Sequence, residues 1–337
     1  MGDVAMTVPV LQCVKDANDV RLTVITRPFL TTLFRDIPAV ETFGADLQNT
    51  YKGFWGIVRL YRHLRKLKID EVADIHDVLR SKILRNLFRM GGIRIQVIDK
   101  GRAEKKALTR AKNKIFQPLQ TTTERYADVF RKLGLSVDLQ NFKPLQAAWD
   151  ESLEVYCGSK SSPWIGIAPF AQHAGKVYPS DLMQWVIDDL AKESVTLFLF
   201  GGGKDEQARL QNYAGAKKNC KVVAGAFSFA EELSLIAQLD VMLSMDSANG
   251  HLAANYGVPV ISLWGATHPY AGFAPFGQPE THSLIADRLR YPDLPTSVYG
   301  NKMPEGYEEA MRTIDPRDVV EKIKEVLVTH RRNRPRE

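Results

Sequence analysis

One segment of the chain, residues 240–269, restricts the possible folds more than any other. It holds two short apolar runs, 241–243 and 260–263, which are too short for helices, and a polar turn follows each of them. Between them, residues 251–256 form a single helical stretch that ends at Gly257. This order predicts two parallel strands whose carboxyl ends meet at one edge of an α/β sheet, the edge at which such sheets bind ligands.

The first of these turns precedes the helical stretch, and its residues are Asp246, Ser247, Ala248, Asn249 and Gly250. A helix N-terminus offers unpaired N–H groups and a positive dipole end to an anion. Asp246 could accept hydrogen bonds from sugar hydroxyls, and His251 could face a phosphate. The alternative is that Asp246 or Ser247 only caps the helix and that His251 packs against it.

The same alternation of short strands and helices runs through most of the 337 residues, enough for two domains. It is interrupted near residues 151–163 by a polar, Pro-containing stretch typical of a linker. We therefore expect two α/β domains, residues 1–157 and 158–337, with a cleft between them. Residues 99–114 are highly charged, and we expect them to be irregular.

Composition excludes several classes of protein. The chain is 45% hydrophobic and 25% charged, as in globular proteins. Its three cysteines are scattered, which suggests neither a zinc site nor a disulfide framework. We expect no signal peptide, and no apolar run approaches the length of a membrane span. We expect a soluble, cytoplasmic protein with no metal site.

The positive charge is concentrated in the first half of the chain. From Lys52 to Lys114 there are eighteen Lys or Arg residues and six Asp or Glu residues, so this region carries +12 while the whole chain carries +6. Such a region suits nucleic acid, an anionic membrane surface, or a phosphorylated or acidic sugar. The alternative is a solvated basic face without a partner.

Two further polar turns follow predicted strands of the second half. One contains Gln172 and Lys176, and a lysine there can balance the charge of a diphosphate. The other is Gly-rich and contains Asp205 and Glu206, which could bind ribose hydroxyls. Each turn taken alone is equally explained as a surface loop, but four such turns on one edge of a sheet predict a nucleotide-diphosphate donor site.

Candidate residues of the first half lie at two turns. Asp3 stands where a helix begins, and a carboxylate there could deprotonate an acceptor hydroxyl or simply cap the helix. Asp74 and His76 follow a predicted strand, and Arg80 comes one turn later, where it could hold an anionic group. A structural, hydrogen-bonded role for His76 is the alternative to a general base.

Together these residues resemble the family 9 glycosyltransferases, the lipopolysaccharide heptosyltransferases. The resemblance covers nearly the whole chain in the right order. Its motifs are Gly-Asp-Val-x-x-Thr-x-Pro at residues 2–9, Lys-x-Tyr-Pro at 176–179, Gly-Gly-x-x-Asp-Glu ending at Glu206, and Asp-Ser-x-x-x-His-x-Ala-Ala followed by Pro-x-x-x-Leu-Trp-Gly-x-Thr within 246–267.

The resemblance implies a GT-B fold with two Rossmann-like domains, in which the second binds the donor and the first binds the acceptor. It further implies an inverting, metal-independent transfer from an ADP-heptose-type nucleotide sugar, with no cofactor. The acceptor would be the inner core of lipopolysaccharide, an anionic lipid A/Kdo-type glycolipid reached at the cytoplasmic face of the inner membrane, with no role for nucleic acid.

The resemblance also implies roles for individual residues. Asp3 would be the general base and Lys176 the diphosphate ligand. The donor-binding candidates are Gln172, Lys176, Asp205, Glu206, Asp246, Ser247, Ala248, Asn249, Gly250, His251 and Thr267. The acceptor-binding candidates are Asp74, His76, Arg80 and Arg62.

The chain departs from the family pattern in three places. Ala248 stands where the family usually has glycine, and Gly250 directly precedes the histidine. Ala171 and Gln172 replace a pair of threonines. The apolar strand that usually precedes the Gly-Asp-Val motif does not occur before Gly2, so we expect that about ten residues, one strand and its turn, are missing from a mis-assigned start.

Three other functions are compatible with these sequence features. A transferase or epimerase of the same fold could use a UDP-sugar. A basic protein could bind nucleic acid, although the basic region lacks interleaved aromatic residues and helix-turn-helix spacing. The chain could also be a degenerate member of the family without activity.

Overall fold

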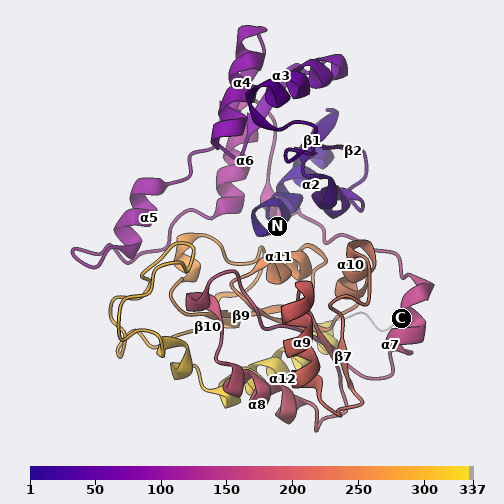
Figure 1. The fold of residues 1–337 in the computed structure, drawn as a ribbon, viewed down its shortest axis with the longest axis vertical. Helices are drawn as coiled ribbons and strands as arrows, with labels where there is room; N and C mark the ends of the chain where they lie inside the picture. Colours follow the sequence, from indigo (N-terminus) through magenta and orange to yellow (C-terminus); the bar gives the residue numbers. More distant parts are fainter. Residues whose placement is uncertain (334–337) are drawn as a thin grey trace. The chain divides into compact units, whose positions relative to one another are not determined.

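The computed structural model describes the backbone of residues 1–333 and the side chains of residues 1–330. The chain forms two compact units. The first consists mainly of Asp3–Arg102 and Gln120–Lys143, and the second of Ala103–Leu119 and the chain from Pro144 onward. Figure 1 shows the elements of both units in the colours of the sequence.

The first unit consists of short helices and two pairs of strands. Its elements are α1 (Gly2–Ala5), α2 (Val8–Ala17), β1 (Leu22–Thr26), η1 (Pro28–Phe34), β2 (Val40–Gly44), α3 (Gly53–Leu64), η2 (Arg65–Leu67), β3 (Glu71–Asp74), α4 (Leu79–Met90), β4 (Arg94–Val97), α6 (Thr122–Lys132) and η3 (Leu139–Asn141). The strands pair in parallel as β1 with β2 and β3 with β4. The predicted α/β domain implied one parallel sheet in this half of the chain. Among the described residues, the structure has two separate two-stranded sheets instead.

The second unit is built on one larger sheet. Its elements are α5 (Arg102–Thr109), η4 (Glu151–Leu153), α7 (Glu154–Cys157), β5 (Trp164–Ala168), η5 (Ala174–Lys176), α8 (Ser180–Leu190), β6 (Thr196–Leu199), α9 (Gly203–Ala214), β7 (Cys220–Val222), α10 (Phe229–Ala237), β8 (Val241–Met245), α11 (Ala248–Asn255), β9 (Val260–Trp264), η6 (Pro269–Ala271), η7 (Glu280–His282), β10 (Ser283–Ile285), η8 (Ala310–Thr313) and α12 (Pro316–Asn333). All six strands run parallel, in the order β10-β9-β8-β5-β6-β7. The predicted parallel sheet of the second half is thus confirmed.

The strand order reverses direction at β5. From β5 the chain proceeds through β6 and β7 to one edge of the sheet, and it then returns to β8 on the other side of β5 and continues outward to β10. The loops that leave β5 and β8 therefore diverge. In open parallel sheets, this switch point is where ligands bind.

Alternate residues of the central strands pack on opposite faces of the sheet. Ile165 and Ile167 of β5 join a buried cluster that also includes residues of α8, α9 and α12. Gly166 points to the other face, where an added Cβ would lie 2.5 Å from Leu239 and 2.9 Å from Met242. Helices α10 and α11 contact each other, and α11 packs on this second face.

The segment expected to be irregular contains a helix. Helix α5 lies within it, and its Lys105 and Leu108 are buried. The ammonium group of Lys105 lies 4.2 Å from the centre of the Phe273 ring, a cation–π contact. Helix α5 thus contacts residues of the second unit that lie far away in the sequence. The number of charged residues in the segment does not predict such contacts.

Across residues 1–333, none of the helices combines the length and the apolar character that crossing a lipid bilayer requires.

Because β5 lies at the centre of the sheet, a cavity beside it should destabilise the protein. Ile167 is fully buried, whereas Val155 of α7 is 96% exposed. We expect Ile167→Ala to lower the free energy of unfolding by about 2–5 kcal/mol and the control Val155→Ala to change it by less than about 0.5 kcal/mol. Urea unfolding of both variants measures the difference, and equal effects would contradict this description of the core.

Candidate functional site

Four polar turns leave the carboxyl ends of parallel strands in the second unit. They follow β5, β6, β8 and β9, which are neighbours in the sheet. Because parallel strands end at the same edge, the structure brings the four predicted turns to one edge. This edge carries Gln172, Lys176, Asp205, Glu206, Asp246, Ser247, Ala248, Asn249, Gly250, His251 and Thr267.

An ion pair joins the two turns at the switch point. The Nζ atom of Lys176 lies 2.9 Å from Oδ2 of Asp246, and their side chains are only 15% and 7% exposed. A largely buried ion pair loses much of its hydration, so it contributes little net stability. It does place one positive and one negative group next to each other at the position where a ligand of such a fold binds.

Helix α11 begins directly after Asp246, and its N-terminus has no side-chain cap. Ser247 occupies the N-cap position but accepts no hydrogen bond from the helix, and its Oγ lies 3.1 Å from Oγ of Ser244 instead. The interpretation that Ser247 only caps the helix is therefore wrong. The N–H groups of the first turn, which includes Ala248 and Asn249, keep their donor capacity.

Two buried polar atoms near this helix lack a partner among the described residues. Nδ1 of His251, on α11, and Oγ1 of Thr267, after β9, form no hydrogen bond. The two residues are 6% and 1% exposed. An unsatisfied buried polar atom costs about 1–3 kcal/mol, so these two atoms indicate a place for a polar ligand.

His251 is neutral at physiological pH. Its burial, together with the positive charge of Lys176, lowers the pKa of its imidazole to about 4. A neutral imidazole has one donor and one acceptor nitrogen. It can bind a hydroxyl or a phosphate oxygen without adding positive charge beside Lys176.

Gly250 has a packing role in the structure. An added Cβ at Gly250 would lie 3.2 Å from Pro275, and 3.4 Å from both Ser244 and Val260. The absence of a side chain lets α11 approach the sheet closely at this position. Its predicted contact with a donor stays a prediction.

The turn after β6 is closed by Glu206. Its Oε2 accepts a hydrogen bond of 2.7 Å from the backbone N–H of Gly202. Asp205 is exposed beside it, and Gln172, in the turn after β5, is also exposed. The Asp205 carboxylate and the Gln172 amide are therefore exposed at the edge that carries Lys176, whereas Glu206 bonds the backbone of its own turn.

A loop that we did not predict supports Lys176. Gly300 has a φ of +81°, and a Cβ there would overlap Cγ and Cδ of Lys176. The Oγ atom of Ser297 holds this loop by accepting a hydrogen bond of 2.9 Å from the N–H of Gly300 and by bonding Oδ1 of Asn301, also at 2.9 Å. The stem of Lys176 therefore lies directly on the backbone of residue 300.

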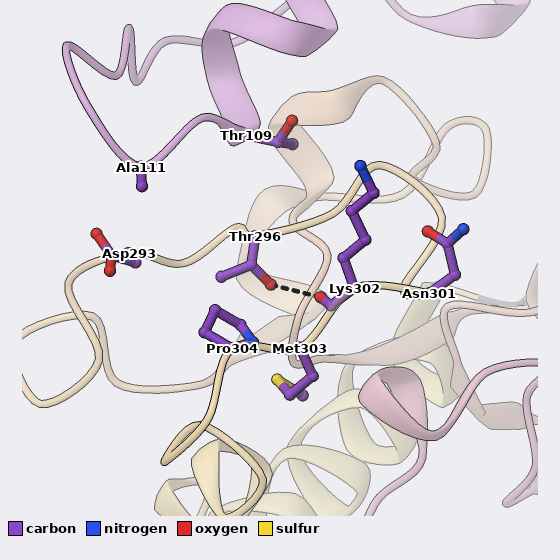
Figure 2. A pocket seen from close by; sticks show the side chains of 8 residues that line it. All are labelled: Thr109, Ala111, Asp293, Thr296, Asn301, Lys302, Met303 and Pro304. Atoms are coloured by element: carbon purple, nitrogen blue, oxygen red, sulfur yellow. Dashed lines mark hydrogen bonds between the residues drawn. The ribbon is translucent and has the colours of Figure 1, made fainter.

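The other side of this loop lines a cavity of about 490 Å³, shown in Figure 2. Its lining comes from two parts of the second unit: Thr109, Ala111, Asp293, Thr296, Asn301, Lys302, Met303 and Pro304. The Oγ1 atom of Thr296 donates a hydrogen bond of 2.9 Å to the carbonyl oxygen of Lys302, and the Lys302 side chain extends toward Thr109. The sequence analysis did not identify this loop, because a glycine by itself does not reveal a positive φ or a contact with Lys176.

The first unit holds a second group of predicted residues. Asp74 is buried, and its Oδ1 accepts hydrogen bonds from the N–H groups of His76 (3.1 Å) and Asp77 (2.8 Å). Its Oδ2 accepts a hydrogen bond of 2.8 Å from Arg85. Asp74 thus organises the turn that carries His76.

His76 reaches solvent but is partly desolvated. This desolvation, followed by the charge of Lys100, lowers the pKa of the imidazole, while the carboxylates of Asp3 and Asp74 oppose the shift. Asp3 is therefore close enough to His76 to interact with it. Asp3 itself is exposed on α1, and Arg62 and Arg80 are exposed on α3 and α4.

No group of three or more His, Cys, Asp or Glu residues that could hold a metal ion occurs within the described part of the chain.

A family model described as glycosyltransferase family 9 (heptosyltransferase) matches residues 57–303. The chain belongs to this family. The glycosyltransferase is 23% identical to lipopolysaccharide heptosyltransferase 3 of Escherichia coli over 275 residues, which cover 79% of this chain and 81% of that protein. It is 26% identical to lipopolysaccharide heptosyltransferase 2 of E. coli strain K12 over 223 residues, or 61% of each chain.

Solved structures share the fold of this glycosyltransferase. A family 9 glycosyltransferase from Veillonella parvula superposes with a TM-score of 0.75 at 16% identity, covering 97% of this chain and 94% of that one. The E. coli ADP-heptose lipopolysaccharide heptosyltransferase II gives 0.69 at 18% identity, covering 97% and 96%. A further E. coli heptosyltransferase, solved with ADP, gives 0.65 at 15% identity, covering 96% of each chain. The predicted family, enzyme class and GT-B fold are confirmed.

Replacing Gly300 tests the support of Lys176. Gly300→Ala introduces both a strained φ and an overlap with the lysine stem, whereas Gly277→Ala introduces a similar strain, at a φ of +71°, with nothing within 4 Å. We expect Gly300→Ala to lower the free energy of unfolding by about 1–3 kcal/mol more than Gly277→Ala does. Urea unfolding measures both variants, and equal losses would show that the loop does not hold the lysine.

The low pKa of His251 predicts a dependence of stability on pH. Between pH about 6.5 and about 4 the unfolded chain binds a proton at this residue that the folded chain does not, so the stability contributed there falls as the pH falls. We expect His251→Asn to make this fall shallower by up to about 1.4 kcal/mol per pH unit. Urea unfolding across this range measures the slopes, and identical slopes would contradict a buried neutral imidazole.

Proposed function

We propose that this glycosyltransferase transfers a heptose from an ADP-heptose-type donor to the inner core of lipopolysaccharide, with inversion at the anomeric carbon and without a metal ion or other cofactor. The observation that carries the proposal is the buried pair of Lys176 and Asp246 beside the uncapped N-terminus of α11. The heptosyltransferases of the same fold, one of them solved with ADP, support the choice of donor.

The donor would bind at the edge of the sheet in the second unit. A diphosphate carries the negative charge that Lys176 and the first turn of α11 can balance. Asp246 would then accept hydrogen bonds from sugar hydroxyls, and Thr267 and His251 would gain the partners that they lack in the protein alone. Asp205 and Glu206 would bind ribose hydroxyls, with Gln172, Ser247, Ala248, Asn249 and Gly250 completing the set.

The chemistry would be a single displacement. The carboxylate of Asp3 takes the proton of an acceptor hydroxyl as that oxygen attacks the anomeric carbon. The new C–O bond forms on one face of the sugar while the bond to the diphosphate breaks on the other. Lys176 and the N–H groups of α11 stabilise the charge that develops on the departing diphosphate.

The acceptor would be an anionic glycolipid of the lipid A/Kdo type, bound through the first unit. Arg62 and Arg80 would contact its phosphate or carboxylate groups, and Asp74 would hold His76 in place beside them. We further propose that the protein works in the cytoplasm, with peripheral contact to the inner membrane and without a role for nucleic acid.

Two substitutions separate donor binding from transfer. We expect Asp3→Ala to lower kcat by about 10²–10⁴-fold while the affinity for ADP stays unchanged. We expect Lys176→Ala to weaken ADP binding by about ten- to a hundredfold, since it removes a charge-assisted contact. The exposed Lys218 gives a matched control, Lys218→Ala. Calorimetry with ADP and a transfer assay with ADP-heptose and a heptose-free core acceptor provide the two readouts.

The same assays decide among the rival functions. A panel of ADP- and UDP-sugars, with and without a chelator, identifies the donor and any need for a metal. Preference for UDP-sugars would replace the proposed donor, and loss of ADP binding in Asp3→Ala would contradict the separation of roles. A folded wild-type protein that neither binds nor transfers any of these sugars would indicate a member of the family without activity.

A further inference from the structure

Helix α3 of the first unit has one face that the structure leaves without a partner. Its buried face consists of Gly56, Ile57, Leu60 and Leu64. Leu60 and Leu64 pack in a cluster with Tyr51 and Phe88. This packing fixes which side of the helix remains outside.

The outer face carries a regular row of basic residues and one tryptophan. Lys52, Trp55, Arg59, Arg62 and Lys66 are all exposed and follow one another at intervals of three or four residues. At 3.6 residues per turn, this spacing places Trp55, Arg59 and Arg62 on one stripe of α3. Lys52 directly precedes the helix, and Lys66 lies in η2, which follows it. We call these five residues the α3 stripe.

Two aromatic rings stand together at the beginning of α3. Trp55 is 78% exposed and Phe54 is 55% exposed. Their ring centres are 5.4 Å apart, in an edge-to-face arrangement. A tryptophan with most of its surface in water is an unfavourable arrangement for a monomer, because a large apolar surface stays hydrated.

The helix turn that carries the aromatic pair packs closely on the backbone that precedes it. An added Cβ at Gly56 would lie 2.5 Å from the carbonyl oxygen of Tyr51 and 2.8 Å from its Cα. The first turn of α3 therefore rests directly on the backbone of Tyr51. The two rings therefore project from a helix turn whose backbone is packed, and not from a loop.

The charges of the α3 stripe are not neutralised within the described part of the chain. None of Lys52, Arg59, Arg62 and Lys66 has a carboxylate within salt-bridge distance there. Arg59 makes a single long hydrogen bond of 3.4 Å to the carbonyl oxygen of Thr50. Four unpaired cations in a row attract an anionic surface more strongly than isolated charges do.

We propose that the α3 stripe, together with Phe54, docks this protein on an anionic lipid bilayer. Trp and Phe side chains enter the interfacial region of a membrane, and lysines and arginines bind the anionic headgroups beside it. The proposal rests on the peripheral membrane contact of the proposed function and names the surface that makes it. The binding is reversible and weakens with salt, because headgroup attraction is screened beyond about 10 Å at 0.1 M salt.

Nucleic acid is the competing partner for a basic surface. Single-stranded nucleic acid binds where aromatic rings are spaced to stack successive bases along a basic groove. Here the two exposed rings are neighbours at one end of the stripe and contact each other edge to face. This arrangement suits insertion at one depth of an interface better than stacking along a strand.

Vesicle binding by the full chain tests the proposal. We expect the protein to co-sediment with vesicles of phosphatidylethanolamine and phosphatidylglycerol and not with vesicles of phosphatidylcholine. Trp55→Ala should reduce the binding by about tenfold or more. Arg59→Ala combined with Lys66→Ala should reduce it by about fivefold for each charge removed.

Matched controls separate this surface from general effects. Trp185 is 39% exposed on α8, and Lys218 and Arg317 are exposed elsewhere in the second unit. Trp185→Ala, and Lys218→Ala combined with Arg317→Ala, should leave vesicle binding unchanged. Circular dichroism and thermal unfolding show whether each variant is folded. The tryptophan variant and the double charge variant remove different groups, so the vesicle binding of one still tests the proposal if the other fails to fold.

Three outcomes overturn the proposal: no binding of the wild-type protein to anionic vesicles, equal losses in the α3 variants and the controls, or binding to single-stranded DNA in place of vesicles. None of these measurements contains a nucleotide sugar. Failure here therefore leaves the donor test intact, and failure of the donor test leaves the docking surface intact.

Discussion

The ion pair of Lys176 and Asp246 joins the two turns between which the strand order of the large sheet reverses. Lys176 follows β5 and Asp246 follows β8, so the pair depends on the pairing of these two strands in the sheet. Around it, the structure places a helix N-terminus without a cap and two buried polar atoms without partners. Each of these features costs free energy in the protein alone, and each would be relieved by a bound anion with hydroxyl groups.

The surroundings of the pair are built to keep it in place. The lysine stem lies on the backbone of Gly300, and Gly175 lies below Ala266, whose N–H bonds the carbonyl oxygen of Gly175 at 2.8 Å. His251 stays neutral beside the lysine because burial and the lysine's charge both disfavour its protonated form. Between the turns that follow β5 and β8, the positive charge is therefore carried by Lys176 and by the first turn of α11.

The sequence predicted much of the fold because strands and helices differ in the period of their apolar residues. The apolar runs at residues 241–243 and 260–263, which were predicted to be strands, lie in β8 and β9, and each predicted polar turn of the second half leaves a strand as expected. The prediction was wrong where long-range contacts decide. Helix α5 was expected to be irregular, yet its buried Lys105 lies against Phe273, and one sheet was expected where the first unit has two pairs of strands.

The sequence by itself determined the residue types of the candidate site and their order along the chain, because the polar turns follow apolar strands whose direction is set by the helices between them. Only the tertiary structure decided what these residues do for one another. It showed that Ser247 does not cap α11, that Gly250 serves helix packing, and that a distant loop at Gly300 supports Lys176. The reason is physical: hydrogen bonds, ion pairs and close packing depend on separations of a few ångströms between atoms, and some of the residues, such as Lys176 and Gly300, lie more than a hundred positions apart in the chain. A local sequence pattern does not contain these separations.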